Sequence, residues 1–537
     1  MPYNSFNNFV FKIKSLLKNN IFLDSSEKNY IKHNEKIWKI NKNNESKKII
    51  MVDLFHWYPL IHFWSYLTNT IAKKEKAEIR YFYFNSRPRR AVKSNLFLNK
   101  LNKIYKSFNV KKGLTSYDFD FSSKEIKNFE KKFKNLKKNK FKLNNFQIDG
   151  IKIGDLIYDS YLFETKNFTI DFNDPILKEI FIEAVKIFYS SKKYFKKNKV
   201  KYLIPSHVCY TPYGIITRIA LKKNVNVVKV KCENWANAFF RLIRIDKNAK
   251  IDEQPFYNYR KIFNKFTERK KEEGIKIGHS ILKKRISGDF DENLPYMKTN
   301  QFKRNNNKLI LKIESSKPKV VIFSHCFYDN PHRFRKLFFN DFYEQITFIL
   351  NLSAKHKKYD WLYKPHPNEL SGNLNVHNLF KKKYPSIQLL DKETSHNQII
   401  KMKPKFVLTN HGTIAHEYAS FKIPVINTGD NPHVCYNFSL HAQSKSHLKD
   451  MILNFDKYKS KINFDKKNIY ELLFMHYYFF PNLYNRKKLI NDNFFAKKNV
   501  KNNHSSSILN YFIKRHASDS NNLKKYIKNF LNHSSNV

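Results

Sequence analysis

The sequence is short of glycine, cysteine and long apolar runs, and each shortage excludes a class of protein. Its 537 residues contain only 10 glycines, and none stands where the Gly-x-Gly-x-x-Gly turn of a dinucleotide-binding dehydrogenase needs them. The 4 cysteines have no paired spacing, so neither a disulfide framework nor a zinc site is expected. No apolar run approaches the roughly 20 residues of a membrane-spanning helix. These shortages predict a cytoplasmic protein that is not a dehydrogenase.

Acidic residues are also scarce, because 45 Asp and Glu stand against 101 Lys and Arg, a formal net charge of +56. Such a charge is typical of nucleic-acid-binding proteins. The excess is nearly all lysine, and it is spread along the whole chain beside Asn, Ile, Phe and Tyr, the residue types that AT-rich codons encode. We therefore predict no nucleic-acid partner. The anions that suit this surface are phospholipid headgroups and phosphorylated carriers.

Near the N-terminus, apolar residues recur at helical spacing, with lysines elsewhere on the helical wheel. The apolar positions are Phe6, Phe9, Val10, Ile13, Leu16 and Leu17. Such a helix is able to lie on anionic lipid or to dock on the protein itself. The sequence therefore allows two locations: the cytoplasm, or the inner face of the cytoplasmic membrane through peripheral contact with its anionic surface.

Strand and helix patterns alternate in two separate halves of the chain, which predicts an α/β protein with two Rossmann-like domains. In the first half, the opening strand–helix–strand unit covers Lys48–Leu54, Leu60–Lys73 and Glu78–Phe84. In the second half, apolar strands are expected at Lys319–Ser324, Trp361–Lys364, Phe406–Thr409 and Ile423–Ile426. The length supports the same reading, because 537 residues suit two domains better than one core.

The turn after the third of these strands has the composition of an anion site. Between this strand and a helix expected from Ile414 to Phe421 stand Asn410, His411, Gly412 and Thr413. Backbone N–H groups at a helix start are unpaired donors near a partial positive charge, and they favour a phosphate. Glu417 follows one turn into the helix, where a carboxylate can accept both hydroxyls of a ribose. Glycine at 412 is expected to serve a positive φ and the approach of the phosphate.

Two further turns carry polar groups at the ends of expected strands. His366 is fixed between two prolines directly after the second strand, which ends at Lys364. His325 and Asp329 follow the first strand. Ligands of open α/β sheets bind at the carboxyl ends of the strands. These four residues therefore join the turn at 410–413 as candidates for binding a nucleotide-activated donor.

Five segments of the sequence together match a family pattern. They are Gly154-Asp155-Leu156-Ile157-Tyr158-Asp159-Ser160-Tyr161, Ile322-Phe323-Ser324-His325-Cys326-Phe327-Tyr328-Asp329, Lys364-Pro365-His366-Pro367-Asn368-Glu369, Asn410-His411-Gly412-Thr413-Ile414-Ala415-His416-Glu417 and Pro424-Val425-Ile426. The segments resemble bacterial glycosyltransferases that build capsules and other surface polysaccharides, with similar His-Pro motifs in Kdo- and sialyltransferases and in teichoic-acid polymerases. The resemblance covers about residues 48 to 480 and is strongest in the second half.

This resemblance implies the GT-B fold, in which two Rossmann-like domains face a cleft, here with helical terminal extensions. It also implies that His366 and the turn at 410–417 bind the phosphate and nucleotide of the donor, with no metal and no other cofactor. The expected order is a 1–47 amphipathic extension, a 48–235 acceptor domain, a 236–316 helical connection, a 317–465 donor domain, a 466–495 helix crossing back and a 496–537 low-complexity tail.

The expected activity is transfer of a hexosyl or Kdo/sialyl-type sugar from a nucleotide-sugar donor to a glycan or lipid-linked glycan acceptor of a capsule, lipopolysaccharide O-chain or similar polymer. A base must take the proton of the acceptor hydroxyl. Four side chains of the first half are candidates, Asp155 ranked first: Asp155, Asp159, His56 and His207. A non-hydrolysing sugar-nucleotide epimerase and a teichoic-acid-type glycerol- or ribitol-phosphate transferase stay open. A non-catalytic polysaccharide or nucleic-acid binder is the alternative from another class.

Overall fold

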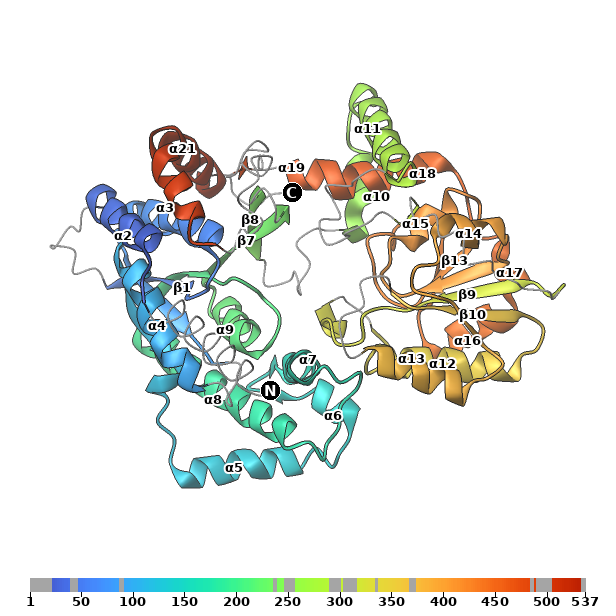
Figure 1. Cartoon of the computed structure of the whole chain (residues 1–537), viewed down its shortest axis with the longest axis horizontal. Helices are drawn as coiled ribbons and strands as arrows, with labels where there is room; N and C mark the ends of the chain where they lie inside the picture. The colour runs from blue at the N-terminus through green and yellow to red at the C-terminus, as the bar shows by residue number, and fades with distance from the viewer. Residues whose placement is uncertain are drawn as a thin grey trace, which may run out of the picture. The chain divides into compact units, whose positions relative to one another are not determined.

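The structure is a computed structural model that describes residues 22–38, 47–85, 91–234, 239–245, 256–288, 301–302, 316–333, 337–366, 373–482, 487–488 and 505–532. The chain forms two compact units (Figure 1). Unit 1 contains the residues up to Asn135, Glu179–Asn248 and the residues from Tyr484 onward. Unit 2 contains Leu136–Lys178 and Ala249–Leu483. The chain therefore leaves unit 1 twice and returns to it for its C-terminal segment.

Unit 1 is built on a mainly parallel sheet with the described strand order β15-β8-β7-β6-β1-β2-β3. Its strands are β1 (Lys48–Asp53), β2 (Glu78–Tyr83), β3 (Val110–Thr115), β6 (Lys199–Ile204), β7 (Asn226–Asn234), β8 (Phe239–Ile245) and β15 (Lys487–Lys488). The helices are α2 (Ser25–Ile37), α3 (Tyr58–Glu75), α4 (Ala91–Lys106), α5 (Ser123–Lys134), most of α8 (Pro175–Lys197), α9 (Thr211–Lys222) and α21 (Ile508–Asn532), with a 3-10 turn η2 (Ser116–Asp118). Strand β1 pairs in parallel with β2 on one side and β6 on the other.

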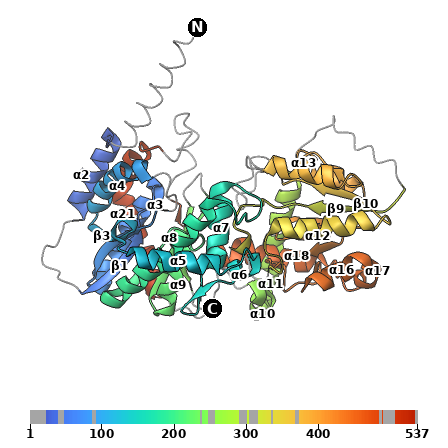
Figure 2. The ribbon, with the colours of Figure 1, turned by 90° about the horizontal axis from the view of Figure 1, so that it is seen from below.

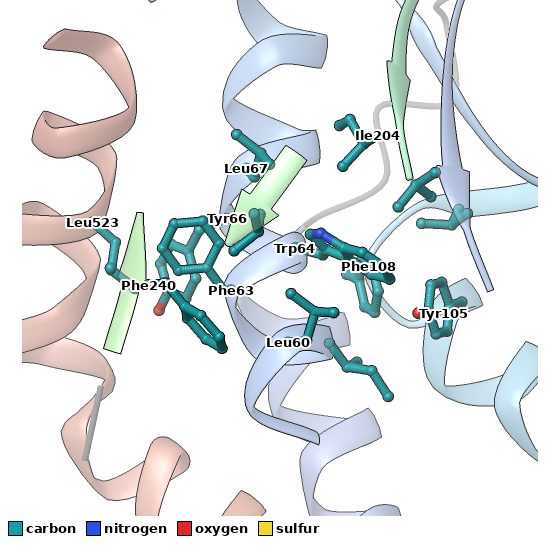
Figure 3. Packing of buried hydrophobic residues seen from close by; sticks show 14 of the residues in the cluster. Leu60, Phe63, Trp64, Tyr66, Leu67, Tyr105, Phe108, Ile204, Phe240 and Leu523 are labelled. Carbon is teal, nitrogen blue, oxygen red and sulfur yellow. The ribbon is translucent and has the colours of Figure 1, made fainter. Parts of the chain in front are cut away.

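The core of unit 1 joins segments from both ends of the chain. Helix α3 is apolar over most of its surface, and the side chains of its residues Phe63 and Trp64 are fully buried. Leu523 of α21 and Phe240 of β8 belong to the same buried cluster (Figure 3). The tail predicted as low-complexity thus contains a long helix whose apolar face packs on α3, because Ile508, Phe512 and other apolar residues of α21 recur at helical spacing.

Unit 2 is built on a wholly parallel sheet with the described strand order β11-β10-β9-β12-β13-β14. Its strands are β9 (Lys319–Phe323), β10 (Asp360–Lys364), β11 (Gln388–Leu389), β12 (Phe406–Thr409), β13 (Val425–Asn427) and β14 (Leu440–His441), with the separate hairpin β4 (Gln147–Ile148) and β5 (Ile151–Lys152). Helices α12 and α13 lie side by side on one face of the sheet, and α14 and α15 lie on the other (Figures 1 and 2). Successive residues of β9 accordingly alternate between two apolar clusters.

The helices of unit 2 complete these layers. They are α6 (Lys140–Asn144), α7 (Gly154–Thr165), α10 (Tyr259–Phe263), α11 (Glu268–Ile286), α12 (Phe342–Lys355), α13 (Asn373–Lys383), α14 (His396–Lys401), α15 (Ile414–Ala419), α16 (Lys445–Leu453), α17 (Phe455–Lys459), α18 (Lys466–Leu473) and α19 (Phe480–Asn482). Short turns are η3 (Phe256–Asn258), η4 (Pro331–Arg333) and the π-helical η5 (Phe474–Phe479).

The segment Leu136–Lys178 groups with unit 2, whereas the sequence analysis places it in the first domain. Asp341, at the start of α12, fastens it: the hydroxyls of Tyr158 and Thr169 both donate to the buried Asp341 carboxylate. Asp159 of α7 is held in the same way by His332 of η4. Polar contacts between residues that are far apart in the sequence therefore attach this segment to unit 2.

The prediction of an α/β fold with two Rossmann-like sheets, the make-up of the GT-B class, is confirmed. The cleft that this class implies stays a prediction. Several strands were not predicted, among them the edge strand β3 and β8, which lies in the predicted 236–316 helical connection. The amphipathic segment at Phe6–Leu17 lies outside the described residues. Among the described residues, no helix combines the length and the apolar character needed to cross a membrane.

Candidate functional site

Three histidines meet at the carboxyl edge of the unit 2 sheet. His325 follows β9, His366 follows β10 and His411 follows β12, and these strands are neighbours in the order β10-β9-β12. The ring centroid of His325 lies 5.8 Å from that of His366 and 6.0 Å from that of His411. The structure thus brings together one residue from each of the three turns that the sequence analysis selected. We call His325, His366 and His411 the histidine cluster.

Burial keeps the histidine cluster neutral. Burial, and next the charge of His325, lowers the pKa of His366 to about 3. The pKa of His411 is well below its usual range, first through burial and then through His325. Burial also lowers the pKa of His325, against the opposing charge of the exposed Asp329. At neutral pH these rings therefore act as hydrogen-bonding groups, each with one N–H donor, rather than as cations.

The backbone around the histidine cluster is held by specific bonds. The His366 N–H donates to Ser324 Oγ at 3.1 Å, which ties the turn after β10 to the turn after β9. His411 Nδ1 lies 2.6 Å from the carbonyl oxygen of Asp430, so Nδ1 carries the proton and donates it. Lys364 is buried, and its ammonium donates to the carbonyl of Lys392 at 2.7 Å. Lys364 therefore adds positive charge behind the cluster rather than an exposed donor.

Asn410 is a buried polar side chain that the fold does not satisfy. It is 3% exposed, and neither its amide nitrogen nor its amide oxygen has a hydrogen-bond partner among the described residues. Gly429, after β13, lies against it: a side chain at Gly429 would collide with Asn410 Oδ1 and would come within 2.8 Å of His411 Cε1. Buried amides without partners are rare in folded proteins. Asn410 is thus available to a ligand, and Gly429 makes the space in which it sits.

Gly412 does not have the positive φ that the sequence analysis expected, because Gly150 and Gly288 are the glycines in that region among the described residues. The need for glycine is steric instead, since a Cβ at Gly412 would lie 2.7 Å from Thr409 Oγ1. Thr413 directly precedes α15, which begins at Ile414 as expected but ends at Ala419. The turn is therefore tight on its strand side, without backbone strain.

Glu417 lies inside unit 2, at 3% exposed. Its carboxylate is 3.9 Å from the buried Arg285 guanidinium and 4.0 Å from His396 Nε2. The sequence analysis missed Arg285, which comes from the distant helix α11. No local sequence pattern identifies Arg285, because only the folded chain brings it close to Glu417.

A chain of hydrogen bonds runs from Arg285 through two histidines. Arg285 Nη1 lies 2.6 Å from His416 Nε2, and a guanidinium can only donate, so His416 accepts there. His416 Nδ1 then carries the proton and donates to His433 Nε2 at 2.9 Å. His433 must therefore be protonated at Nδ1, which is buried and has no partner among the described residues. The Nδ1–H group of His433, in the loop after β13, is thus a second buried polar group without a partner among the described residues.

Unit 1 has its own polar group at the carboxyl edge of β1 and β6. Asp53 ends β1, and the hydroxyl of Ser206, after β6, donates to its carboxylate. His207 Nδ1 lies 2.9 Å from Ser206 Oγ. Because Ser206 gives its only proton to Asp53, His207 Nδ1 donates to Ser206, and this bond orients the imidazole ring. Burial raises the pKa of Asp53 to about 7, against the Ser206 hydrogen bonds.

The four predicted base candidates are divided between the units. His207 belongs to this Asp53–Ser206–His207 chain, and His56 lies in the turn after β1, with its ring 5.0 Å from that of Tyr58. Asp155 and Asp159 are buried in α7 of unit 2. Asp53 was missed, although its signal was present: it is the only acidic residue in the expected strand Lys48–Leu54.

Acid is expected to destabilise the protein through the histidine cluster, whose pKa values are lowered in the folded state. The folded-state pKa of His366 is about 3, below the usual 6.5, so its contribution is full above about pH 6.5 and is lost as the pH falls toward 3. When the pH falls from about 7.5 to about 5.5, this histidine alone lowers the free energy of unfolding by about 1 kcal/mol. Urea unfolding at both pH values should show a smaller loss in His366→Asn than in the unchanged protein. An equal loss would mean that His366 is not held neutral.

Comparison with models of protein families finds no match, and neither does comparison with curated proteins. Solved structures resemble the chain only distantly. A β-Kdo 2,7-transferase, KpsC of Thermosulfurimonas dismutans, is 13% identical, with 55% of this chain and 86% of that chain covered at a TM-score of 0.31. A UDP-N-acetylglucosamine 2-epimerase is 12% identical, with 80% and 95% covered at 0.22. A glycosyltransferase of Rickettsia africae is 9% identical, with 89% and 98% covered at 0.25. At such values the activity has to be argued from the site itself.

Proposed function

We propose that this protein is a glycosyltransferase that moves a sugar from a nucleotide-activated donor to a growing surface polysaccharide. Unit 2 binds the donor through the histidine cluster and Asn410, and unit 1 binds the acceptor at the edge formed by β1 and β6. The observation that carries the proposal is the convergence of the histidine cluster from three neighbouring strands, beside the unsatisfied Asn410 amide.

The chemistry of the unit 2 edge suits the phosphate of a nucleotide-sugar. The neutral imidazoles of His325 and His366 and the Asn410 amide can donate hydrogen bonds to phosphate oxygens, and such bonds to a charged group are the strong ones. His411, whose Nδ1 proton goes to Asp430, donates to a phosphate through Nε2 once its ring is protonated. The bound anion in turn favours the protonated imidazole, so the pKa of the rings rises on binding. The buried ammonium of Lys364 contributes positive charge close to His366. The same groups stabilise negative charge on the nucleotide when the sugar leaves.

The unit 1 edge supplies a group that can accept a proton. His207 is the candidate whose ring is oriented by a chain of hydrogen bonds, since its Nδ1 donates to Ser206 Oγ and the Ser206 hydroxyl donates to Asp53. A base held in this way takes the proton of the attacking hydroxyl as that oxygen bonds to the sugar. We therefore assign the base role to His207 among the four candidates, with Ser206 and Asp53 positioning its ring.

The test is release of free nucleotide from CMP-, UDP-, GDP- and CDP-linked sugars, with and without oligosaccharides of surface polysaccharides as acceptors. A transferase releases nucleotide and forms a longer glycan. His207→Gln should lower transfer about 100-fold while donor binding stays unchanged. His33→Gln is the matched control, since His33 is a histidine of the same unit on α2, packed on His516. An epimerised donor without net nucleotide release, or equal effects of both variants, would contradict the proposal.

A further inference from the structure

Asp159 and His332 form a buried pair that the sequence analysis did not foresee. Asp159 lies on α7 and His332 on η4, and His332 Nδ1 donates to Asp159 Oδ1 at 2.6 Å. The backbone N–H of His332 donates to Asp159 Oδ2 at 3.3 Å. The side chains are 3% and 7% exposed. Two bonds from one residue to one carboxylate fix the plane and the direction of the imidazole.

The other nitrogen of this ring has no partner in the part of the chain that the structure describes. His332 Nε2 is buried and makes no hydrogen bond to any described residue. Because Asp159 takes the proton on Nδ1, Nε2 is the position left for an outside group. Buried polar atoms of this kind nearly always have a partner in the working state of a protein. A ligand atom is the natural partner here.

His332 belongs to the same loop as His325, one member of the histidine cluster. The loop after β9 carries His325 at its start and η4 at its end, and the charge of Arg333 helps to lower the pKa of His411. The pair therefore lies on the carboxyl side of the unit 2 sheet, where the proposed donor phosphate binds. All of these residues belong to one compact unit.

The charges around His332 favour its protonated form. Burial lowers the pKa of His332, but the charge and hydrogen bond of Asp159 outweigh it, and the net pKa is raised. Asp155 acts in the same direction and Lys152 in the opposite one, while the ring of Tyr158 stands edge-on at 4.9 Å. A histidine with this environment can hold a proton near neutral pH and give it up when a base of similar strength forms beside it.

We propose that His332 is the proton donor to the leaving nucleotide phosphate and that Asp159 is its positioning residue, a role that rests on the proposed function. The bond between the anomeric carbon and the phosphate oxygen breaks, and its electron pair stays on that oxygen. The oxygen takes the proton from Nε2, which leaves His332 neutral. Solvent then returns the proton to the ring after the nucleotide has departed.

Asp341 offers a matched control for a merely structural role of the pair. Like Asp159 it is a buried carboxylate that joins α7 to another element, in this case by accepting a hydrogen bond from the Tyr158 hydroxyl of α7. It bonds no histidine in the described part of the chain. Asp341→Asn and Asp159→Asn therefore both weaken the attachment of α7, but only the second changes the proton affinity of His332.

The experiment uses the full chain and the nucleotide-sugar of a CMP-, UDP-, GDP- and CDP-linked panel that raises its melting temperature most. Donor affinity and the rate of nucleotide release are measured against pH for Asp159→Asn, His332→Gln and Asp341→Asn. We expect donor affinity within about twofold of the unchanged protein in all three. Release should fall about 100-fold in His332→Gln. In Asp159→Asn the alkaline limb of the rate profile should move to lower pH, because the proton is held less tightly.

Each other outcome overturns the assignment in a recognisable way. If the alkaline limb of the pH–rate profile stays unchanged in Asp159→Asn, or moves equally in Asp341→Asn, the Asp159–His332 pair only attaches α7 and has no catalytic role. Loss of donor binding in His332→Gln would make His332 a binding residue. If no nucleotide-sugar of the panel binds the unchanged protein, the proposed function itself fails, and the role of His332 fails with it.

Discussion

Replacing His366 by alanine is expected to weaken donor binding about 100-fold, the effect of losing one hydrogen bond to a charged group from a preformed site. The melting temperature should change little, because His366 is only partly buried and its backbone N–H, which survives the substitution, makes the bond to Ser324. Titration calorimetry with the best donor of the panel measures both affinity and stoichiometry.

The control for this substitution is His377→Ala in the same unit. His377 is a buried histidine on α13 whose Nδ1 lies 3.0 Å from the hydroxyl of Tyr363, and burial lowers its pKa to about 4. It resembles His366 in chemistry but is no member of the histidine cluster. We expect His377→Ala to lower the melting temperature and to leave donor affinity unchanged. Equal losses of affinity in the two variants would remove the histidine cluster from the binding site.

Gly429→Ala is the second substitution with a large expected effect. The added methyl group would overlap Asn410 Oδ1 and press on the His411 ring, both proposed to contact the donor phosphate. Overpacking of this kind costs about 1–3 kcal/mol of stability. A displacement of about 1 Å in positioning groups costs about 100-fold in rate. Transfer should therefore fall far more than the melting temperature indicates.

Gly274→Ala is the control that distinguishes a general effect of overpacking from a specific effect on the donor site. A methyl group at Gly274, on α11 of the same unit, would meet the ring of Phe474 at 2.8 Å. The steric load is similar, but the neighbour is an apolar side chain of the core. We expect a lower melting temperature with unchanged transfer per folded molecule. Normal transfer in Gly429→Ala would contradict the placement of Asn410 and His411 at the donor.

Local patterns predicted the four central strands of the unit 2 sheet, β10, β9, β12 and β13, because these short apolar strands are bounded by turns with marked polar residues. The expected strand Phe406–Thr409 is β12 to the residue, and the expected start of the next helix at Ile414 is that of α15. Periodicity also located β1, α3 and β2. The edge strand β3 was missed, since its lysines at 111 and 112 disguise a strand that only pairing with β2 stabilises.

Long-range partners explain what the sequence did not reveal about the site. The selected residues His325, His366 and His411 could be found because each directly follows a strand. Neither Arg285 beside His416 nor His332 beside Asp159 has a local signal, because each pair is more than 100 residues apart in sequence. The grouping of α7 with unit 2 depends on the same kind of contact, with Asp341.

The most direct measurement of the central claim is a thermal-shift screen of the full chain against CMP-, UDP-, GDP- and CDP-linked sugars. We predict that at least one of them raises the melting temperature by several degrees at saturating concentration, as binding to the folded state alone requires, and that His366→Ala loses this shift while His377→Ala keeps it. No shift with any of these donors, or a shift that persists in His366→Ala, would contradict a nucleotide-sugar site at the histidine cluster.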